Sequence, residues 1–473
     1  MTPARRRCAL VAVSLVTFMA YLDNNIVNVA LPSIQEDLRF TVSGLEWVVS
    51  AYILVFGTFL LFGGRLGDIR GWRPLFLSGL GLFTLSSLVA GMATSPAMLV
   101  AGRACQGLGA AAVTPTTLAI ISAVYPDERR RANAVGVWNA VGALALAVGP
   151  LLGGVISQHL AWGWIFFVNV PVGLATLVLG AWAIRLPKPA GEKQSMDIAG
   201  TLSSGGALFA LTFSLIEGHE FGWDSPVILG GFVAAGLLAA VFAVAETKVA
   251  HPMLTISLLW DRVFGGGVAT MFIWAFGLFG IFFFTSLYLQ DVLLFSPTEA
   301  GLAFVPMAVL MIAGSVLSGP AAARVGAHRS VSGAMALIAA GIAGAALLDA
   351  NATFAEVMPP LLVIGLGGGF TTSLTATVLA AMPGRQAGVA TAVFSTVRQI
   401  GGLLGVAVIG AVLTAQQTTE SHRGAPFRDA FLSGYHKALI VAAVLVAVGA
   451  AIAYFALRAK LPETDPHQSG AEH

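Results

Sequence analysis

The sequence contains few charged residues. Only 10% of its 473 residues are Asp, Glu, Lys or Arg, whereas 57% are hydrophobic and the mean hydropathy is +0.85. Soluble domains carry about 25% charged residues. The composition therefore excludes an ordinary soluble protein and predicts a chain that crosses a membrane many times. Only two cysteines are present, Cys8 and Cys105, far apart in the sequence, which excludes a disulfide framework and a thiolate metal site.

Several signals of soluble chemistry are also missing. The eight histidines are scattered, and none has Cys or acidic residues at metal-ligand spacing. There is no GxxxxGK[ST] loop for a nucleotide phosphate and no basic stripe for a nucleic acid. No segment between hydrophobic runs is long enough for a catalytic domain. We therefore expect no enzyme activity, no cofactor, no metal, no nucleic-acid partner and no use of ATP.

Apolar runs long enough to cross a bilayer recur along the whole chain. The two runs at 74–93 and 97–121 are separated only by a turn sequence that ends in Pro96, which predicts a tight hairpin. We predict fourteen transmembrane helices: 8–31, 46–64, 74–93, 97–121, 133–157, 164–185, 198–217, 226–245, 264–288, 300–322, 329–348, 357–381, 388–414 and 435–457.

The basic residues predict how these spans are oriented. If the N-terminus is cytoplasmic, nineteen of the 25 Lys and Arg residues fall on the inside, four fall outside, and Arg103 and Arg398 fall within spans. Cytoplasmic loops carry an excess of Lys and Arg, so we expect both termini to lie in the cytoplasm. We expect the protein to reside in the plasma membrane. The first run is too long for a signal peptide and no convincing cleavage site follows, so we expect an uncleaved first span.

A weak internal repeat divides the chain. The segment 64–73 after the second span resembles the segment 319–329 after the tenth, because both are basic and both have outer glycines seven residues apart. Parallel repeats are typical of transporters whose binding site lies between the two halves. We predict a six-helix bundle at 1–186, a two-helix insert with cytoplasmic linkers at 187–263, and a second six-helix bundle with a short tail at 264–473.

One carboxylate stands out. Asp23 lies inside the first span, where an acid costs about 2.5–3.5 kcal/mol to insert, so an intramembrane acid indicates a functional site. The alternatives are that Asp23 is solvated near the far interface or that it pins a neighbouring helix. Arg103 in the fourth span must likewise face protein or water. Asp23 is its obvious partner, because we find no other acid well inside a predicted span.

Two glycine-containing segments suggest moving parts. In the loop 64–73, the acid and basic side chains suit a lock between bundles that forms and breaks, although ordinary basic loop composition is the alternative. In the fifth span, glycines at 142, 149 and 153 share one face, and Pro150 kinks the helix. The lock residues are Gly64, Asp68, Arg70, Gly71 and Arg73, and the residues of the fifth span are Gly149, Pro150, Gly153 and Gly154.

These motifs together resemble the major facilitator superfamily, and within it the fourteen-helix drug:proton antiporters. The stretch from Leu22 to Pro32 is similar to the LDxTIVNVALP motif of that subfamily, and Gly64–Arg73 resembles the GxLaDrxGrr loop. Arg103 to Gly107 resembles RxxQG, and Gly149 to Gly154 resembles GPxxGG. The segments 162–171 and 288–302 resemble two further stretches of the subfamily.

The resemblance implies a major facilitator fold and export of lipophilic drugs or antibiotics, driven by protons through alternating access. Asp23 and Arg103 would then carry proton coupling. Family members that export dications have further acids deep in later helices, and we find none in spans two, thirteen and fourteen. We therefore expect lipophilic monocations, neutral or zwitterionic compounds to be preferred over dications. The candidate residues for the substrate cavity are Asn25, Asn28, Tyr52, Gln106, Trp138, Trp274, Phe279, Phe394 and Arg398, with Trp47, Phe276 and Phe283 as further aromatic contributors.

Two other functions remain open. One is a proton-coupled uptake transporter on the same fold, against which the GPxxGG-like helix argues. The other is a membrane sensor that transports nothing, against which Asp23 and Arg103 argue, because a sensor has no need to bury them. For the leading hypothesis, export, we expect a small-molecule drug or antibiotic, protons and the lipid bilayer as partners, and a monomeric protein.

Overall fold

The computed structural model describes residues 2–186, 197–248, 256–382 and 387–458, and no strand occurs among them. Lys188, Lys193, Arg385 and Lys460, four of the basic residues counted as cytoplasmic, lie outside this part, as do most of the first predicted linker and the tail beyond 458. The helices are α1 (Pro3–Leu38), α2 (Val42–Arg70), α3 (Trp72–Gly91), α4 (Pro96–Val124), α5 (Glu128–His159), α6 (Trp164–Phe167), α7 (Asn169–Ala183), α8 (Ile198–Phe221), α9 (Pro226–Lys248), η1 (Ile256–Trp260), α10 (Arg262–Leu287), η2 (Tyr288–Val292), α11 (Pro297–Val325), α12 (Ala327–Ala345), α13 (Phe354–Phe370), α14 (Thr372–Ala380), α15 (Ala387–His422) and α16 (Phe427–Ala456).

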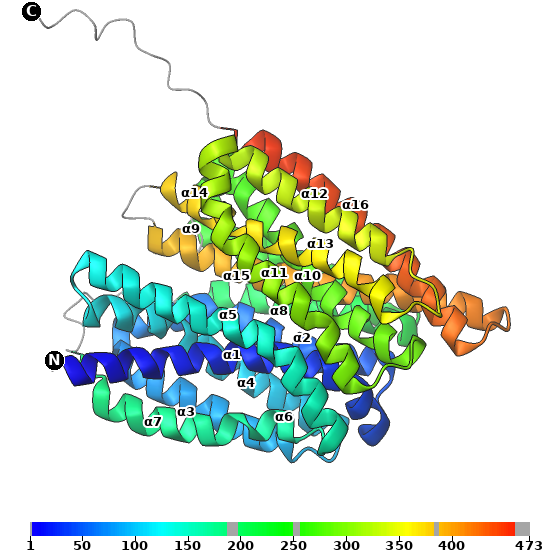
Figure 1. Cartoon of the computed structure of the whole chain (residues 1–473), viewed down its shortest axis with the longest axis horizontal. Helices are drawn as coiled ribbons and strands as arrows, with labels where there is room; N and C mark the ends of the chain where they lie inside the picture. Colours follow the sequence, from blue (N-terminus) through cyan, green and yellow to red (C-terminus); the bar gives the residue numbers. More distant parts are fainter. Residues whose placement is uncertain (1, 187–196, 249–255, 383–386, 459–473) are drawn as a thin grey trace, which may run out of the picture.

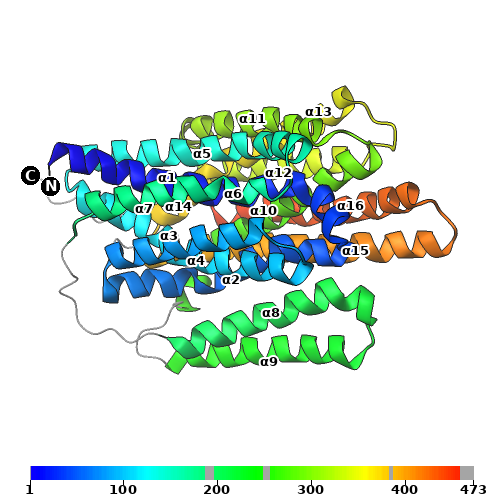
Figure 2. The same cartoon turned by 90° about the horizontal axis from the view of Figure 1, so that it is seen from below.

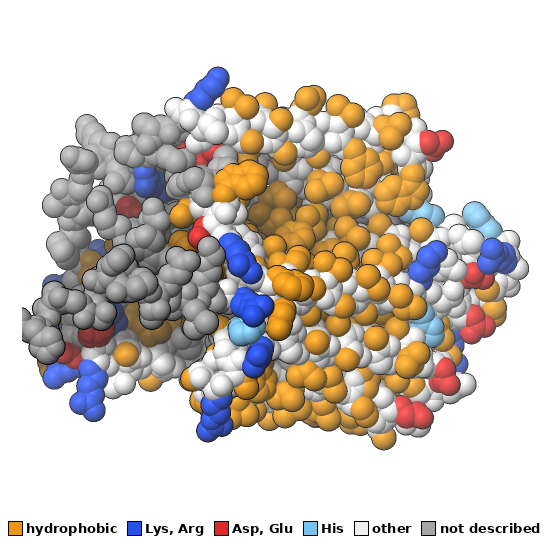
Figure 3. Space-filling view, turned by 90° about the horizontal axis from the view of Figure 1, so that it is seen from above, with side chains coloured by type: hydrophobic (Ala, Val, Ile, Leu, Met, Phe, Trp, Pro, Cys, Tyr) orange, Lys and Arg blue, Asp and Glu red, His pale blue; other side chains and the backbone are white. Residues whose placement is uncertain are grey.

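The predicted membrane fold is confirmed. Thirteen helical segments of the described residues are long and apolar enough to cross a membrane, counting α6 with α7, α10 with η2, and α13 with α14 as single segments. The shorter α12 occupies the remaining predicted position, at 329–348. A broad belt of hydrophobic side chains covers the face shown in Figure 3. This belt is the surface that a bilayer would cover.

Local sequence explains where the helices begin. Ser95 accepts a hydrogen bond from the amide of Met98 and Pro96 is the first residue of α4, so the predicted hairpin after α3 is present. Asp127 caps α5 in the same way. Ser296 and Glu299 form a reciprocal capping box at α11. These caps satisfy amide groups that a helix leaves unpaired at its N-terminus.

The internal repeat is clear in the backbone. Helices α2 and α11 both contain 29 residues. Each ends at a glycine with positive φ, Gly71 at 99° and Gly326 at 88°, and each of these glycines leads directly into the next helix. Residues other than glycine almost never adopt this backbone conformation. The offset of 255 residues between Gly71 and Gly326 is the offset predicted from the sequence.

The helices form two groups with a pair beside them. In Figure 1, α1–α7 and α10–α16 converge on the right and separate on the left, where α1 begins. Figure 2 shows α8 and α9 together at one edge of the molecule. Helix α8 contacts both α2 and α15, whereas α9 packs mainly against α8. We propose these three groups as the units of the chain, with the boundaries at 186 and 263 predicted above.

The two groups meet in what we call the seam, the contacts of α1 with α10 and of α5 with α11 at the end away from the termini. Ser286 Oγ donates to the carbonyl of Asn28 at 2.8 Å, and Gln290 Nε2 donates to the carbonyl of Val29 at 3.0 Å. On the other side of the seam, a Cβ placed on Gly154 would collide with the carbonyl of Pro297. The seam therefore depends on backbone surfaces that approach each other closely.

We expect Gly154→Leu to open the seam, because the new side chain must push α11 away from α5. Overpacking of this kind costs about 1–3 kcal/mol, which shifts the population of the closed arrangement roughly tenfold. Spin labels at Leu160 and Phe427, both exposed and on opposite groups, would report a longer distance.

The matched control is Gly136→Leu on the same helix, where an added Cβ would meet nothing described within 4 Å. The labelled pair should keep the wild-type distance in this variant. Equal distances in both variants would contradict the assignment of Gly154 to the seam.

Candidate functional site

Asp23 and Arg103 form an ion pair in the core of the first helix group. Arg103 Nη1 donates to Asp23 Oδ2 at 2.5 Å, and both side chains are 0% exposed. The residues come from α1 and α4, eighty positions apart. The alternative that Asp23 is solvated near the interface is therefore wrong. Asp23 is the partner of Arg103, as predicted.

Neutral side chains and a backbone carbonyl form further hydrogen bonds with this ion pair. Gln106 Nε2 and Asn169 Nδ2 each donate to Asp23 Oδ1 at 2.9 Å, and Gln106 Nε2 also donates to Ser87 Oγ at 2.8 Å. Arg103 Nε donates to the carbonyl of Val48 at 2.9 Å. Helices α1, α2, α3, α4 and α7 thus meet at one buried network. These hydrogen bonds offset part of the cost of burying the two charges. Arg103 Nη2 and Asn169 Oδ1 are buried atoms of the network without a hydrogen-bond partner among the described residues.

A single aromatic ring separates the pair from the central cavity. The guanidinium carbon of Arg103 lies 4.4 Å from the centroid of the Tyr52 ring, a cation–π distance. Tyr52 itself lines the cavity, whereas Asp23 and Arg103 do not. On α1, the cavity is lined instead by Tyr21, Asn24, Asn25 and Asn28. The charged pair therefore lies behind the cavity wall and is not part of its surface.

The cavity lies between the two helix groups and has a volume of about 1030 Å³. Helices α1, α2, α4 and α5 line one side, and α10, α11 and α15 line the other. Seven of the nine predicted cavity residues line it: Asn25, Asn28, Tyr52, Trp138, Trp274, Phe279 and Arg398.

The other predicted cavity residues lie elsewhere. Gln106 points to Asp23, as described, because it shares a helix face with Arg103 three residues away. Phe394 is 3% exposed and packs near the ring of Phe264. Among the further aromatic candidates, Phe276 and Phe283 are buried in the core, and Trp47 donates to Glu217 at 2.8 Å.

The predicted lock residues lie at the end of α2 and the start of α3, and two of the five line the cavity. Gly64 and Asp68 line the rim, and Asp68 is exposed. Arg73 Nη2 donates to the carbonyl of Ala181 in its own helix group at 3.0 Å. The two ion pairs found in the described chain do not involve Arg70 or Arg73. Gly71 forms the turn between α2 and α3. Their role in a lock stays a prediction.

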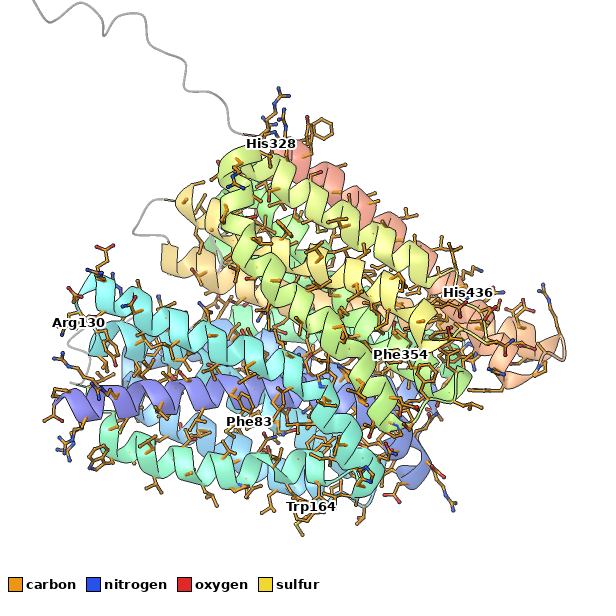
Figure 4. The ribbon with its side chains drawn as sticks, viewed as in Figure 1. Phe83, Arg130, Trp164, His328, Phe354 and His436 are labelled. Atoms are coloured by element: carbon orange, nitrogen blue, oxygen red, sulfur yellow. The ribbon has the colours of Figure 1, made fainter. Side chains whose placement is uncertain are left out.

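The glycine face of the fifth predicted span packs as expected from its spacing. Along α5, an added Cβ at Gly142 would meet the ring of Tyr21, one at Gly149 would meet Asn25, and one at Gly153 would meet the carbonyl of Ile26. The face therefore lies along α1. Pro150 contributes its carbonyl to the contact with Gly301 of α11, so α5 packs against both helix groups. Figure 4 shows the two groups far apart at Arg130 of α5 and His328 of α12.

The sequence analysis missed a second buried acid. Glu46 is 2% exposed, and an added Cβ on Gly410 of α15 would lie 2.5 Å from its carboxyl carbon. The statement that span two carries no deep acid is therefore wrong. The helical period does not reveal it, because all residues from Val48 to Leu54 are buried and no single buried face of α2 stands out. Asn169 was also missed, although it lies in a motif that was identified.

Comparisons with known proteins agree with this geometry. The profile of the Major Facilitator Superfamily matches residues 13–406. The chain is 33% identical over 470 residues to the puromycin resistance protein of Streptomyces alboniger, a match that covers 98% of this chain and 93% of that protein. It is 36% identical to the cephamycin export protein of Amycolatopsis lactamdurans, over 94% of this chain and 93% of that one. The methylenomycin A resistance protein of Bacillus subtilis is 35% identical over 88% of this chain and 90% of its own.

Solved structures share the fold at low sequence identity. A bacterial homolog of the human lysosomal transporter Spinster aligns with a TM-score of 0.69 and 17% identity, over 97% of this chain and 98% of that one. A peptide transporter aligns with a TM-score of 0.67 and 14% identity, over the same shares of the two chains.

The ion pair predicts a specific pattern of stability. Asp23→Asn and Arg103→Met should each destabilise the protein by about 3–5 kcal/mol, because each leaves one buried charge without its partner. The double variant should recover part of this loss. Thermal unfolding of purified protein in detergent measures the three effects.

The exposed pair of Arg423 and Glu420 provides the control. Arg423→Gln should change stability by less than about 1 kcal/mol, since solvent screens exposed pairs. If the loss in the double variant equals the sum of the two single losses, the pair makes no net interaction and our description of the network is wrong.

Proposed function

The chain belongs to the Major Facilitator Superfamily, and we propose that it is a proton-coupled antiporter that exports lipophilic drugs or antibiotics. It is a multi-pass membrane transporter rather than an enzyme, as its family and its relatives indicate. The export direction is supported by relatives whose names describe drug resistance or export, among them the puromycin, cephamycin and methylenomycin A proteins. The proton gradient would be the energy source, with no cofactor.

The orientation follows from the distribution of Lys and Arg. We place both termini in the cytoplasm and the protein in the plasma membrane, because the basic loops lie on the side of the termini. The cavity then opens to the cytoplasm, where Arg65 and Asp68 line its rim, and the seam closes it toward the outside. This is the arrangement in which an exporter would load its substrate.

One observation carries the proposed coupling: α1 belongs both to the ion pair and to the seam. Asp23 holds α1 against α4, and five and six residues further along α1 the carbonyls of Asn28 and Val29 accept hydrogen bonds from α10. A change in how α1 is held at Asp23 would therefore alter the contacts that close the outer end.

The proton would act on the Asp23 carboxylate. A proton arriving from outside binds Asp23 and removes its negative charge, while Arg103 stays charged. The ion pair then loses its attraction, and Arg103 retains the carbonyl of Val48 and the ring of Tyr52 as partners. Because Tyr52 lines the cavity and also contacts Arg103, a bound substrate and the ion pair would both act on this ring. Release of the proton to the cytoplasm would restore the pair.

The two alternatives are less well supported. An uptake transporter would need the same coupling with the opposite direction of substrate movement, and the named relatives argue for export. A sensor without transport would have no use for a cavity of about 1030 Å³ between two helix groups.

Efflux assays test this proposal. Everted membrane vesicles that contain the protein should accumulate at least one of puromycin, cephamycin and methylenomycin A when energised, and should lose it when a protonophore collapses the gradient. Asp23→Asn should reduce uptake to the level of vesicles without the protein, because its side chain cannot alternate between charged and neutral states.

Glu36→Gln is the matched control, since Glu36 is an exposed acid on the same helix. It should leave uptake unchanged. Accumulation that persists with the protonophore would overturn proton coupling, and cephamycin and methylenomycin A should be tested in parallel before export itself is rejected.

A further inference from the structure

Among the described residues that line the cavity, Arg398 of α15 is the cation without a counter-ion, because Arg65 lies near Asp68 on α2. The charged residues that line the cavity are Arg65, Asp68, Asp197 and Arg398. Neither ion pair found in the described chain involves Arg398. Its Nε is buried and has no hydrogen-bond partner among the described residues. Its guanidinium carbon lies 6.0 Å from the ring centroid of Tyr21, at the limit of a cation–π contact.

The two acids of the cavity are too distant to neutralise Arg398. An added Cβ on Gly57 of α2 would lie 3.1 Å from Gln399, so this level of α15 faces Gly57 and Thr58 of α2. Asp68 is about ten residues further along α2, which corresponds to roughly 15 Å. An added Cβ on Gly205 of α8 would collide with Thr58, and Asp197 precedes Gly205 by about eight residues, or roughly 12 Å. Both distances are well beyond the roughly 4 Å within which two side chains form an ion pair.

The two acids also have other roles. Asp197 accepts a hydrogen bond from the amide of Gly200 at 2.7 Å and caps α8. Asp68 is exposed at the rim. Asp23, the nearby acid of α1, is paired with Arg103 behind Tyr52. The inner part of the cavity is therefore positively charged.

A second donor faces the same cavity. Trp274 of α10 lines it, and its Nε1 is buried without a hydrogen-bond partner among the described residues. A guanidinium and an indole N–H are both donors only. Buried donors left without partners cost free energy, and an acceptor on a ligand removes that cost. Apolar side chains such as Leu278, Phe279 and Phe282 line the cavity beside them.

We propose that Arg398 and Trp274 form an anion-binding subsite, which selects substrates that carry a carboxylate or a similar acidic group on an apolar or aromatic body. Anionic and zwitterionic compounds would bind through this group. Lipophilic monocations, included in the range expected from the sequence, would be disfavoured by the unpaired charge. The subsite rests on the proposed function, because it assigns the substrate class of the export cavity.

Equilibrium binding tests this charge preference without any need for transport. Three probes share one aromatic body: 4-(1-pyrenyl)butyrate, the neutral 4-(1-pyrenyl)butanol, and 4-(1-pyrenyl)butyltrimethylammonium. Binding is measured by equilibrium dialysis to the protein in phosphatidylcholine nanodiscs, with empty nanodiscs subtracted. The butyrate should bind about tenfold or more tightly than the ammonium probe, since hydrogen bonds to a charged group contribute that much.

Two variants and one control locate the preference. Arg398→Gln should remove the preference for the butyrate and leave binding of the butanol unchanged, whereas Arg398→Lys should retain most of it. Arg65→Gln, which removes the other cation that lines the cavity, should leave the preference as in the wild type. If Arg398→Gln does not fold, the three wild-type affinities still decide the charge class.

Three results would overturn the subsite. The first is that the wild type binds the ammonium probe as tightly as the butyrate or more tightly. The second is that Arg398→Gln loses affinity for all three probes equally. The third is that Arg398→Gln still prefers the butyrate to the ammonium probe as the wild type does. Addition of phosphatidylglycerol to the nanodiscs separates a second source of the same chemistry: if it displaces the butyrate only when Arg398 is present, an anionic lipid headgroup also occupies the subsite. A failed efflux assay with positive binding would reject the proposed function and leave the subsite in place.

Discussion

The structure depends on one buried charge, the guanidinium of Arg103. Arginine stays protonated in a protein, so α4 can lie in the interior only if its neighbours provide a counter-ion and acceptors. Asp23, Gln106 and the carbonyl of Val48 do so, and Asn169 and Ser87 complete the hydrogen bonds of Asp23 and Gln106. The first helix group is therefore organised around a polar centre within a protein whose surface must stay apolar. In the proposed mechanism this centre alternates between two charge states, because Asp23 would bind and release a proton while Arg103 stays charged.

The same helix that carries Asp23 closes the far end of the molecule. The carbonyl of Asn28 is free to accept a hydrogen bond across the seam, because Pro32, four residues further along α1, has no N–H to donate to it. The carbonyl of Val29 accepts a second hydrogen bond across the seam, from Gln290. The cavity between these two regions is lined by Tyr52, which also stacks on Arg103. In the proposed mechanism, the substrate cavity, the proton site at Asp23 and the seam would be linked through contiguous contacts of α1 and α2, and no long-range mechanism is needed to connect them.

Most of the fold could be predicted from the sequence, because helix length, hydrophobicity and capping are local properties. The face of α5 at Gly142, Gly149 and Gly153 followed from the helical period alone. The pairing of Asp23 with Arg103 followed from the cost of burying either charge singly. The direction of Gln106 and Phe394 could not be predicted, because both lie on helices with more than one buried face and only the packing of neighbouring helices decides which face meets the cavity. Glu46 was missed for a different reason: it lies near the start of α2, where the length criterion treats an acid as interfacial, although α15 covers it there.

The helix pair α8–α9 makes the two lateral edges of the molecule unequal. Helix α8 lies against both α2 and α15 and so covers the line where the two helix groups meet on that side, and α9 turns side chains such as Val233, Leu237 and Val241 outward. On the opposite side, α5 and α11 meet with no further helix of the described chain over them. A compound dissolved in the bilayer would therefore find one lateral approach to the cavity blocked by a whole hairpin and the other bounded by a single layer of helix. A compound that enters from the lipid phase would therefore enter on the side of α5 and α11. The two related halves by themselves would not create this preference, because it comes from the α8–α9 pair.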